Sequence, residues 1–352
     1  MLTIRFDEAA SLDTKLVGGK AHGLATMTQA GMPVSPGFTV STKAYHQYLD
    51  AAGLREKISG LLELVDRHSI EALSDAERAI GGWFEAGTFP EALHANVHEA
   101  YSHLCADVGI ENVSVAVRSS ATAEDAEGAS FAGEYDTFVG ISGAGDVERY
   151  LRKCWASAFT GRSMAYAWKN GISPLEVEMA VVVQKTVRAR AAGVMFTLSP
   201  LTGDRSRIVI EAAYGLGLSV VGGEVTPDRY VVAKIGGEIL DRVVGEKQVE
   251  YLTGHAATPV DEERRKQLCL RDAEVMELAH LGKALERKHQ RPVDVEFAVD
   301  TELPSGRGIV LLQCRPETYW SSRHAATKPP PISDVAQAVL ATVLRKPGVD
   351  DK

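Results

Sequence analysis

Two segments near the carboxyl end carry acidic, amide and basic side chains at alternating positions. Asp294 and Glu296 are two residues apart in one segment, and Gln313 and Arg315 are two apart in the next. Such side chains share one face of a strand, so pairing of the two predicted strands would bring them together. Because Mg²⁺ prefers hard oxygen ligands beside phosphate oxygens, Glu296 and Gln313 are predicted to hold this ion. Arg315 would then neutralise phosphate charge; the alternative is an ordinary ion pair between Glu296 and Arg315.

An anion site is predicted where a strand over residues 113–118 ends. Arg118 stands at the carboxyl end of this segment, and Ser119 and Ser120 follow it directly. A guanidinium presents fixed donors that suit phosphate oxygens, and neighbouring hydroxyl groups add to them. The alternative is an ion pair between Arg118 and one of the acids at positions 124–125.

A glycine-rich segment is a further candidate for phosphate contacts. Gly18 and Gly19 precede Lys20 at the predicted start of a helix, where backbone N–H groups and an ammonium group attract anions. A P-loop is excluded, because Thr14 and Ala21 replace the glycine and the hydroxyl residue of that pattern. The alternative is a glycine turn followed by a solvated lysine.

Small residues at positions 129–133 are suited to a loop whose backbone approaches a polyphosphate. Gly133 has no Cβ and allows the closest approach, and the hydroxyl of Thr137 adds a donor. An ordinary hairpin turn would have the same composition.

The composition favours a globular protein of two lobes. The chain has 352 residues, of which 45% are hydrophobic and 24% charged, and a formal net charge of -9, which argues against non-specific binding to nucleic acid. The four cysteines are widely spaced, so no disulfide framework is expected. We find no signal-peptide pattern and no apolar run of membrane-spanning length, and we expect a cytoplasmic protein without membrane contact.

Hydrophobic periodicity predicts the helices and strands that carry these candidate site residues. Residues 41–108 and 146–169 have helical patterns, and a series of strands begins at residue 179. Asp261 is predicted to cap a long helix that carries Leu268 and Leu285. Residues beyond 318, with a proline-rich linker at 328–331 and a short helix at 335–344, are expected to be peripheral.

Two histidines on the predicted helical segment do not fit a zinc protease pattern. His98 and Glu99 are followed by His103, one residue too far for the HExxH spacing. His94 and His98 are therefore interpreted as a pair on a helix surface.

Taken together, the motifs resemble the ATP-binding domain of the phosphoenolpyruvate synthase, pyruvate phosphate dikinase and rifampin phosphotransferase family. The resemblance covers roughly residues 10–318. The motifs lie in order at positions 18–20, 118–125, 130–133, 136–137, 183–184, 193–197, 214–217, 226–228, 294–296 and 313–316.

The resemblance implies an α+β, ATP-grasp fold in which two lobes close on ATP. The expected boundaries are 1–190 for the first lobe, 191–318 for the second, and 319–352 for a linker and tail. The implied cofactors are ATP and Mg²⁺. The resemblance also implies phosphate contacts for Lys20, Arg118 and Arg315, and it places Gly133 and Thr137 in the loop that covers the phosphates. Gln184 is implied to lie near adenine. Glu296 and Gln313 are implied to hold the metal.

Members of the resembled family transfer the β-phosphoryl group of ATP to a histidine on a separate domain, releasing AMP and phosphate. The resemblance therefore implies that Lys20, Arg118 and Arg315 act by positioning and charge neutralisation, without a nucleophile from this chain. Leu218 stands where the family often has glutamate, which leaves a detail of that loop open. His324 lies in a tail too short to form the histidine domain.

We therefore expect a split enzyme whose partner subunit carries the phosphohistidine, similar to the beta subunit of phenylphosphate synthase. The final acceptor is expected to be a small molecule such as phenol, pyruvate or an antibiotic. The alternatives are a non-catalytic ATP-sensing module and an ADP-forming ATP-grasp ligase, which would use the γ-phosphoryl group.

Overall fold

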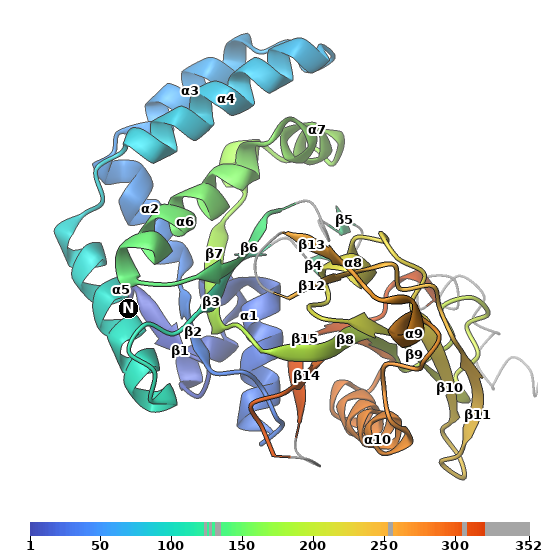
Figure 1. Ribbon diagram of the computed structural model, residues 1–352. Helices are drawn as coiled ribbons and strands as arrows, with labels where there is room; N and C mark the ends of the chain where they lie inside the picture. Colours follow the sequence, from blue (N-terminus) through green and yellow to red (C-terminus); the bar gives the residue numbers. More distant parts are fainter. Residues whose placement is uncertain (123–124, 127–128, 131–134, 253–255, 305–307, 321–352) are drawn as a thin grey trace, which may run out of the picture. The chain divides into compact units, whose positions relative to one another are not determined.

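The computed structural model describes residues 1–122, 125–126, 129–130, 135–252, 256–304 and 308–320. Residues 1–316 form one unit and residues 317–352 belong to a second. The first unit contains two larger sheets with helices packed against them (Figure 1). This mixture confirms the predicted α+β class and is consistent with the ATP-grasp expectation.

The first sheet has five strands, and every pairing in it is antiparallel. The predicted strand at 113–118 forms its fourth strand, starting and ending slightly later than expected. In sheet order the strands are β1 (Thr3–Arg5), β2 (Gly37–Val40), β7 (Met179–Lys185), β3 (Val115–Ala121) and β6 (Thr137–Ile141).

Helices cover the first sheet with an apolar core centred on Trp155, Tyr45, Tyr48 and Phe84. Helical structure over residues 41–108 is confirmed. The single helix predicted at 146–169 is wrong, because the hydroxyl of Thr160 accepts from the Ser163 amide and starts a new helix. The helices are α2 (Thr42–Ala51), α3 (Leu54–Leu64), α4 (Ile70–Ala86), α5 (Glu91–Val108), α6 (Ala144–Ala156) and α7 (Gly161–Lys169).

The second sheet has six antiparallel strands, and α10 (Asp272–His289) packs on one of its faces. Alternate residues of the strands, such as Val295 and Phe297, are buried with Val275 and Leu278 of α10. The opposite face carries the polar positions. In sheet order the strands are β11 (Ile239–Val243), β10 (Asp228–Ala233), β9 (Arg207–Tyr214), β8 (Ala189–Phe196), β14 (Val293–Asp300) and β15 (Ile309–Pro316).

The long helix predicted to start at Asp261 is wrong. Asp261 caps only the short helix α9 (Glu262–Arg265), by accepting from the Arg264 amide. The chain then bends because the Cys269 amide donates to the buried carboxylate of Asp228, and α10 begins at Asp272. A tertiary requirement thus interrupts a locally helical pattern.

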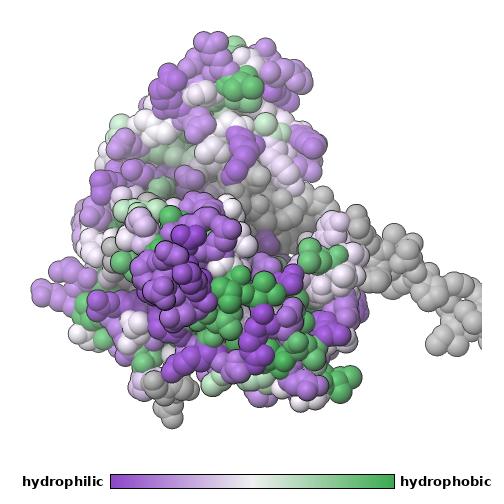
Figure 2. Space-filling model, turned by 45° about the vertical axis from the view of Figure 1, so that its right-hand side comes forward, coloured by the Kyte–Doolittle hydropathy of each residue, from purple (hydrophilic) through white to green (hydrophobic). Residues whose placement is uncertain are grey.

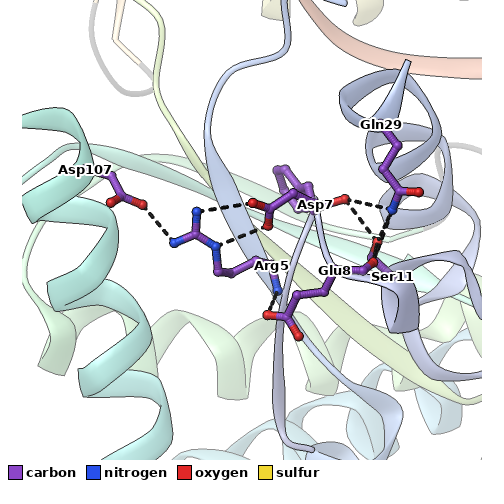
Figure 3. Close-up of polar contacts among 7 residues, drawn as sticks. Arg5, Asp7, Glu8, Ser11, Gln29 and Asp107 are labelled. Atoms are coloured by element: carbon purple, nitrogen blue, oxygen red, sulfur yellow. Dashed lines mark hydrogen bonds and ion pairs between the residues drawn. The ribbon is translucent and has the colours of Figure 1, made fainter. Parts of the chain in front are cut away.

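Side-chain contacts join the amino-terminal segment to two helices (Figure 3). Arg5 of β1 forms ion pairs with Asp7 and with Asp107 of α5. The amide of Gln29, at the end of α1 (Thr14–Gln29), donates to the carbonyl of Glu8 and to the hydroxyl of Ser11. These contacts fix the two ends of the segment that contains α1.

Helix α1 contributes to the core of the second sheet although it stands early in the sequence. Val17, Leu24 and Met27 are buried in the same cluster as Leu311 and Cys314. Gly23 lets the helix approach closely, since a Cβ there would lie 2.6 Å from the Cys314 carbonyl oxygen. Helix α1 therefore contacts strands of both sheets.

The remaining elements are short. They are the helix α8 (Leu218–Val221), the 3₁₀ turns at Ala9–Leu12, Ser157–Phe159 and Pro174–Glu176, and the strand pairs β4 (Asp125–Ala126) with β5 (Ala129–Ser130) and β12 (Val249–Tyr251) with β13 (Ala257–Pro259). The face seen in Figure 2 is mainly hydrophilic with scattered hydrophobic groups. Among the described helices, none is long and apolar enough to cross a membrane. The expected elements at 328–331 and 335–344 lie outside the described residues.

Candidate functional site

Arg118 joins the two sheets at the centre of the candidate site. From β3 of the first sheet, one guanidinium nitrogen donates to the Glu296 carboxylate at 2.8 Å and to the Gln313 side-chain oxygen at 2.9 Å. The other terminal nitrogen donates to the Leu312 carbonyl at 2.9 Å. The Arg118 side chain is only 12% exposed and that of Glu296 25%. The structure thus brings Arg118, Glu296 and Gln313 into direct contact.

The partner of Arg118 differs from the alternative considered for it. We considered an acid at 124–125, within the same loop, whereas the observed ion pair reaches Glu296 on the other sheet. The Glu124 position lies outside the described residues. Arg118 thus connects elements that are far apart in the sequence.

A β-bulge shapes the second side of the site. Glu296 of β14 pairs with Gln313 of β15, but Phe297 pairs with Leu311, so Leu312 is the extra residue. A bulge leaves a backbone group outside the ladder and redirects nearby side chains. Here the Leu312 carbonyl accepts the second hydrogen bond from Arg118. The bulge therefore helps to position the guanidinium.

The predicted strand pairing around Glu296 is confirmed. Asp294 lies opposite Arg315, and Glu296 lies opposite Gln313. The Arg315 side chain, 40% exposed, pairs with Asp294 at 3.4 Å. The alternative of a Glu296–Arg315 ion pair is wrong, since each acid has a different basic partner. Arg315 lies two residues along β15 from Gln313, which Arg118 contacts.

The same row of the sheet contains an acid that sequence reasoning missed. Glu296 pairs with Val194 of β8, which pairs with Glu211 of β9. Directly paired residues share a face, so Glu211 lies on the polar face of Glu296. Burial raises the pKa of Glu211, and the charge of Arg229 opposes this shift. The alternation of residues 207–211 was a usable signal, because it put Glu211 on the side opposite to Ile208 and Ile210.

Lys20 follows a break in α1 that is held against β3. Gly18 has φ +73° inside the helix, and a Cβ on it would lie 2.0 Å from the Ser120 carbonyl oxygen. The Ser120 hydroxyl donates to the Val17 carbonyl at 2.7 Å and accepts from the Ala21 amide at 3.1 Å. Helix α1 starts at Thr14, earlier than predicted, but the helical run containing Lys20 does begin after this glycine break.

Lys20 lies near Cys154 of α6, a helix that packs against β3. Burial and the charge of Asp136 raise the pKa of the Cys154 thiol, and the nearby charge of Lys20 opposes this shift. Cys154 in turn contacts the Val117 carbonyl, one residue before Arg118. Lys20 thus lies near the strand that carries Arg118.

Thr137 and Gln184 occupy the strands beside Arg118. Thr137 of β6 pairs directly with Arg118, so the two share a face. Gln184 of β7 is buried, and its amide nitrogen donates to the Ser35 carbonyl at 3.1 Å. Gly133, predicted in the phosphate-covering loop, lies outside the described residues.

The donor set suits a Mg²⁺ ion. Oxygens of Glu296 and Gln313 both approach one cationic nitrogen of Arg118, at 2.8 and 2.9 Å, so they already converge on a single positive centre. Carboxylate and amide oxygens are hard ligands of the kind that Mg²⁺ takes. The buried Nε of Arg118 has no hydrogen-bond partner among the described residues, which leaves a donor for an anion. The residues present therefore fit a metal with a phosphate beside it.

Comparison with known proteins also indicates a nucleotide-binding domain. A family described as the pyruvate phosphate dikinase AMP/ATP-binding domain matches residues 14–334. The chain is 40% identical over 316 residues to a probable phosphoenolpyruvate synthase of Methanothermobacter thermautotrophicus, a match that covers 89% of this chain and 45% of the relative.

Two further relatives extend the match along the chain. A probable phosphoenolpyruvate synthase of Methanocaldococcus jannaschii is 38% identical over 347 residues, covering 97% of this chain and 29% of the relative. The phosphoenolpyruvate synthase of Aeropyrum pernix is 37% identical over 381 residues, covering 99% and 46%. The chain spans less than half the length of these relatives. It belongs to the family of pyruvate phosphate dikinase AMP/ATP-binding domains.

Proposed function

We propose that this chain is the ATP-binding catalytic part of an AMP-forming dikinase. It would bind ATP with Mg²⁺ and direct the β-phosphoryl group to a histidine on a partner domain or subunit. The observation that carries the proposal is the convergence of Arg118 with Glu296 and Gln313 across two sheets. A guanidinium, a carboxylate and an amide oxygen at one point are the groups that a metal-bound polyphosphate requires.

Arg118 has a dual part in this proposal. In the structure it contacts Glu296 and Gln313 and so offsets the charge of Glu296. With nucleotide it would turn its guanidinium toward phosphate oxygens, using the Nε donor that has no partner among the described residues.

The remaining residues would position the triphosphate. Lys20 and Arg315 would add positive charge on either side, and Thr137 would donate its hydroxyl from the strand beside Arg118. Glu296 and Gln313 would hold Mg²⁺, which when bound draws negative charge from the phosphate oxygens. Gln184 would lie near adenine and Gly133 in the covering loop. Phosphoryl transfer depends mainly on such positioning and charge compensation.

The acceptor is proposed from the relatives. Three similar proteins are named phosphoenolpyruvate synthases or probable ones, and this chain corresponds to less than half of each. A histidine carrier in the sequence that those relatives have in addition would receive the phosphoryl group. Pyruvate is then favoured over phenol or an antibiotic as the final acceptor.

The test follows the label and the nucleotide product. The chain is incubated with Mg²⁺, a candidate histidine partner and ATP labelled at either the β- or the γ-phosphate. We expect AMP and a partner phosphorylated by the β label in acid-labile form. ADP as the only product, with γ label on the acceptor, would instead support the ligase alternative.

A matched pair of variants tests the metal site without a partner. Glu296→Gln should weaken Mg²⁺-dependent ATP binding by about 100-fold, measured by calorimetry, whereas Glu286→Gln on α10 should bind like the wild type. Glu286 pairs with Lys234 and is a carboxylate of similar exposure outside the site. Equal binding by both variants would remove Glu296 from the metal site. Normal ATP binding without turnover, with every partner tried, would favour the sensing module.

A further inference from the structure

Two histidines of α5 and a glutamate of α6 form a cluster outside the nucleotide site. His94 and His98 are four residues apart, so their side chains lie on the same face of α5. The His94 Nδ1 lies 2.7 Å, and the His98 Nε2 3.2 Å, from one carboxylate oxygen of Glu148. The expectation of a plain surface pair is therefore incomplete, because a third residue from another helix joins it.

Glu148, the acid of this cluster, is buried, and a buried carboxylate needs hydrogen-bond or ionic partners. The Glu148 side chain is only 10% exposed. Its oxygen Oε1 and the His98 Nε2 are both buried and form no hydrogen bond of acceptable geometry among the described residues, although they lie within ion-pair distance. A buried carboxylate oxygen without a directional hydrogen bond is costly. An additional ligand at this point would remove that cost.

The three side chains offer the ligand set of a borderline divalent metal. One atom from each lies within 4.8 Å of the others. Zinc bound to nitrogen and oxygen at about 2.0–2.2 Å separates neighbouring ligand atoms by roughly 3.3 Å. The distances of 2.7 and 3.2 Å to the Glu148 oxygen bracket this value, and side-chain rotation would have to adjust the separation of the two histidine nitrogens, which is at most 4.8 Å. The histidine side chains are 45% and 39% exposed, which leaves access for the ion and for water as a remaining ligand.

The surrounding structure holds the two helices in place. The hydroxyl of Tyr101 on α5 donates to the Val113 carbonyl and accepts from the Gly143 amide, which precedes α6. This bridge joins α5 to the residue that precedes α6, the same two helices that carry the cluster. The ligands are thus presented by a preformed framework, and changing one of them should not unfold the protein.

We infer that His94, His98 and Glu148 form a binding site for a divalent transition-metal ion of the Zn²⁺ type. The ion would link α5 to α6 and has no part in phosphoryl transfer. Mg²⁺ is not expected to bind here, because imidazole nitrogen suits zinc-like ions and Mg²⁺ prefers oxygen. The site is independent of the proposed nucleotide chemistry.

The test uses chelator-treated protein without a histidine tag, titrated with Zn²⁺ alone in a calorimeter and with Co²⁺ in a spectrometer. We expect one Zn²⁺ per chain, an absorption spectrum of low-coordinate Co²⁺, and a higher melting temperature with Zn²⁺. His98→Ala and Glu148→Gln should each weaken binding at least tenfold. His103→Ala, an exposed histidine of the same helix, should bind like the wild type.

Several outcomes would overturn the inference. They are the absence of saturable Zn²⁺ binding, unchanged binding in His98→Ala, and unchanged binding in Glu148→Gln, which would leave a two-histidine contact without the carboxylate. Circular dichroism of each variant shows whether it is folded. If Glu148→Gln were unfolded, Glu148→Asp, which keeps a carboxylate but draws it back, should fold and bind more weakly than the wild type.

Discussion

Two ion pairs in this molecule have similar chemistry and opposite surroundings. Arg118 and Glu296 meet between the two sheets, with side chains 12% and 25% exposed. Lys247 and Asp228 meet within the second sheet region and are both 0% exposed. The first cation keeps a donor without a partner among the described residues, whereas the second has its ammonium and its carboxylate surrounded by hydrogen bonds.

The buried pair of Lys247 and Asp228 makes the full set of hydrogen bonds that is expected of a structural ion pair. The Lys247 ammonium donates to Asp228 and to the carbonyls of Gly245 and Arg265. Asp228 accepts from the amides of Gly245 and Cys269. Burial raises the pKa of the Cys269 thiol well above its usual range, and the Asp228 charge adds to this effect. The contrast teaches that incomplete hydrogen bonding at a charged pair, more than the pair itself, marks a place for a ligand.

The largest effect should come from breaking the saturated pair. Lys247→Met leaves Asp228 buried and unpaired, and the free energy of unfolding should fall by about 3–5 kcal/mol. Urea unfolding followed by circular dichroism measures this change. The double variant with Asp228→Leu should recover part of the loss, and a loss below about 1 kcal/mol in the single variant would contradict the contrast.

Breaking the unsaturated pair should affect the ligand instead. Arg118→Met should lower the affinity for ATP with Mg²⁺ by about 100-fold, equivalent to about 2.7 kcal/mol. The free energy of unfolding should fall by less than in Lys247→Met, because the Glu296 side chain left without its partner is 25% exposed whereas Asp228 is fully buried. Calorimetry and urea unfolding on the same preparation separate the two quantities. A variant that unfolds easily but binds ATP normally would make this pair structural too.

The attachment of α1 to β3 can be tested at Gly18. Gly18→Ala adds a Cβ against the Ser120 carbonyl at a backbone φ of +73°, so we expect a loss of about 1–3 kcal/mol in stability. Gly31→Ala is the matched control, since it also has positive φ but nothing lies within 4 Å of its Cβ position. Similar losses in both variants would mean that backbone strain, and not the contact with β3, determines the effect.

The smallest effect concerns a partly buried histidine with several basic side chains nearby. Burial lowers the pKa of His289, and the charges of His22, Arg291 and Lys288 lower it further. Because the folded pKa lies below the unfolded value of about 6.5, the unfolded state binds the proton more readily. Stability should therefore decline as the pH falls below about 6.5 and level off below the folded pKa.

His289→Gln removes this titration, so its unfolding free energy should decline less between pH 7 and pH 5 than that of the wild type. Urea unfolding at several pH values measures the difference. His68→Gln provides a control at an exposed position. A slope equal to that of the wild type in His289→Gln would assign the pH dependence to other groups.

The sequence predicted those parts of the site that depend on local periodicity. Alternation was enough to place Asp294 and Glu296 on one face and to suggest the pairing with Gln313 and Arg315. It could not predict the bulge at Leu312, because an extra residue depends on the twist of the finished sheet. Nor could it identify the partner of Arg118, which lies in another sheet.

Tertiary effects also explain the other errors. The helix expected from Asp261 is interrupted because the Cys269 amide is needed by Asp228. Glu148 was not associated with His94 and His98, since the three residues come from two helices whose packing is not visible in spacing. Where a polar group is satisfied by a distant backbone atom, periodicity alone gives the wrong boundary.

The placement of α1 has a consequence for how the chain acquires its structure. Its apolar residues Val17, Leu24 and Met27 are covered by β15, whose Leu311 and Cys314 are synthesised almost 300 positions later. Such contacts are slow to form, because a long loop must close before they contribute. A nascent chain would leave this face of the helix uncovered until β15 emerges, which makes the early segment a natural binding target for chaperones.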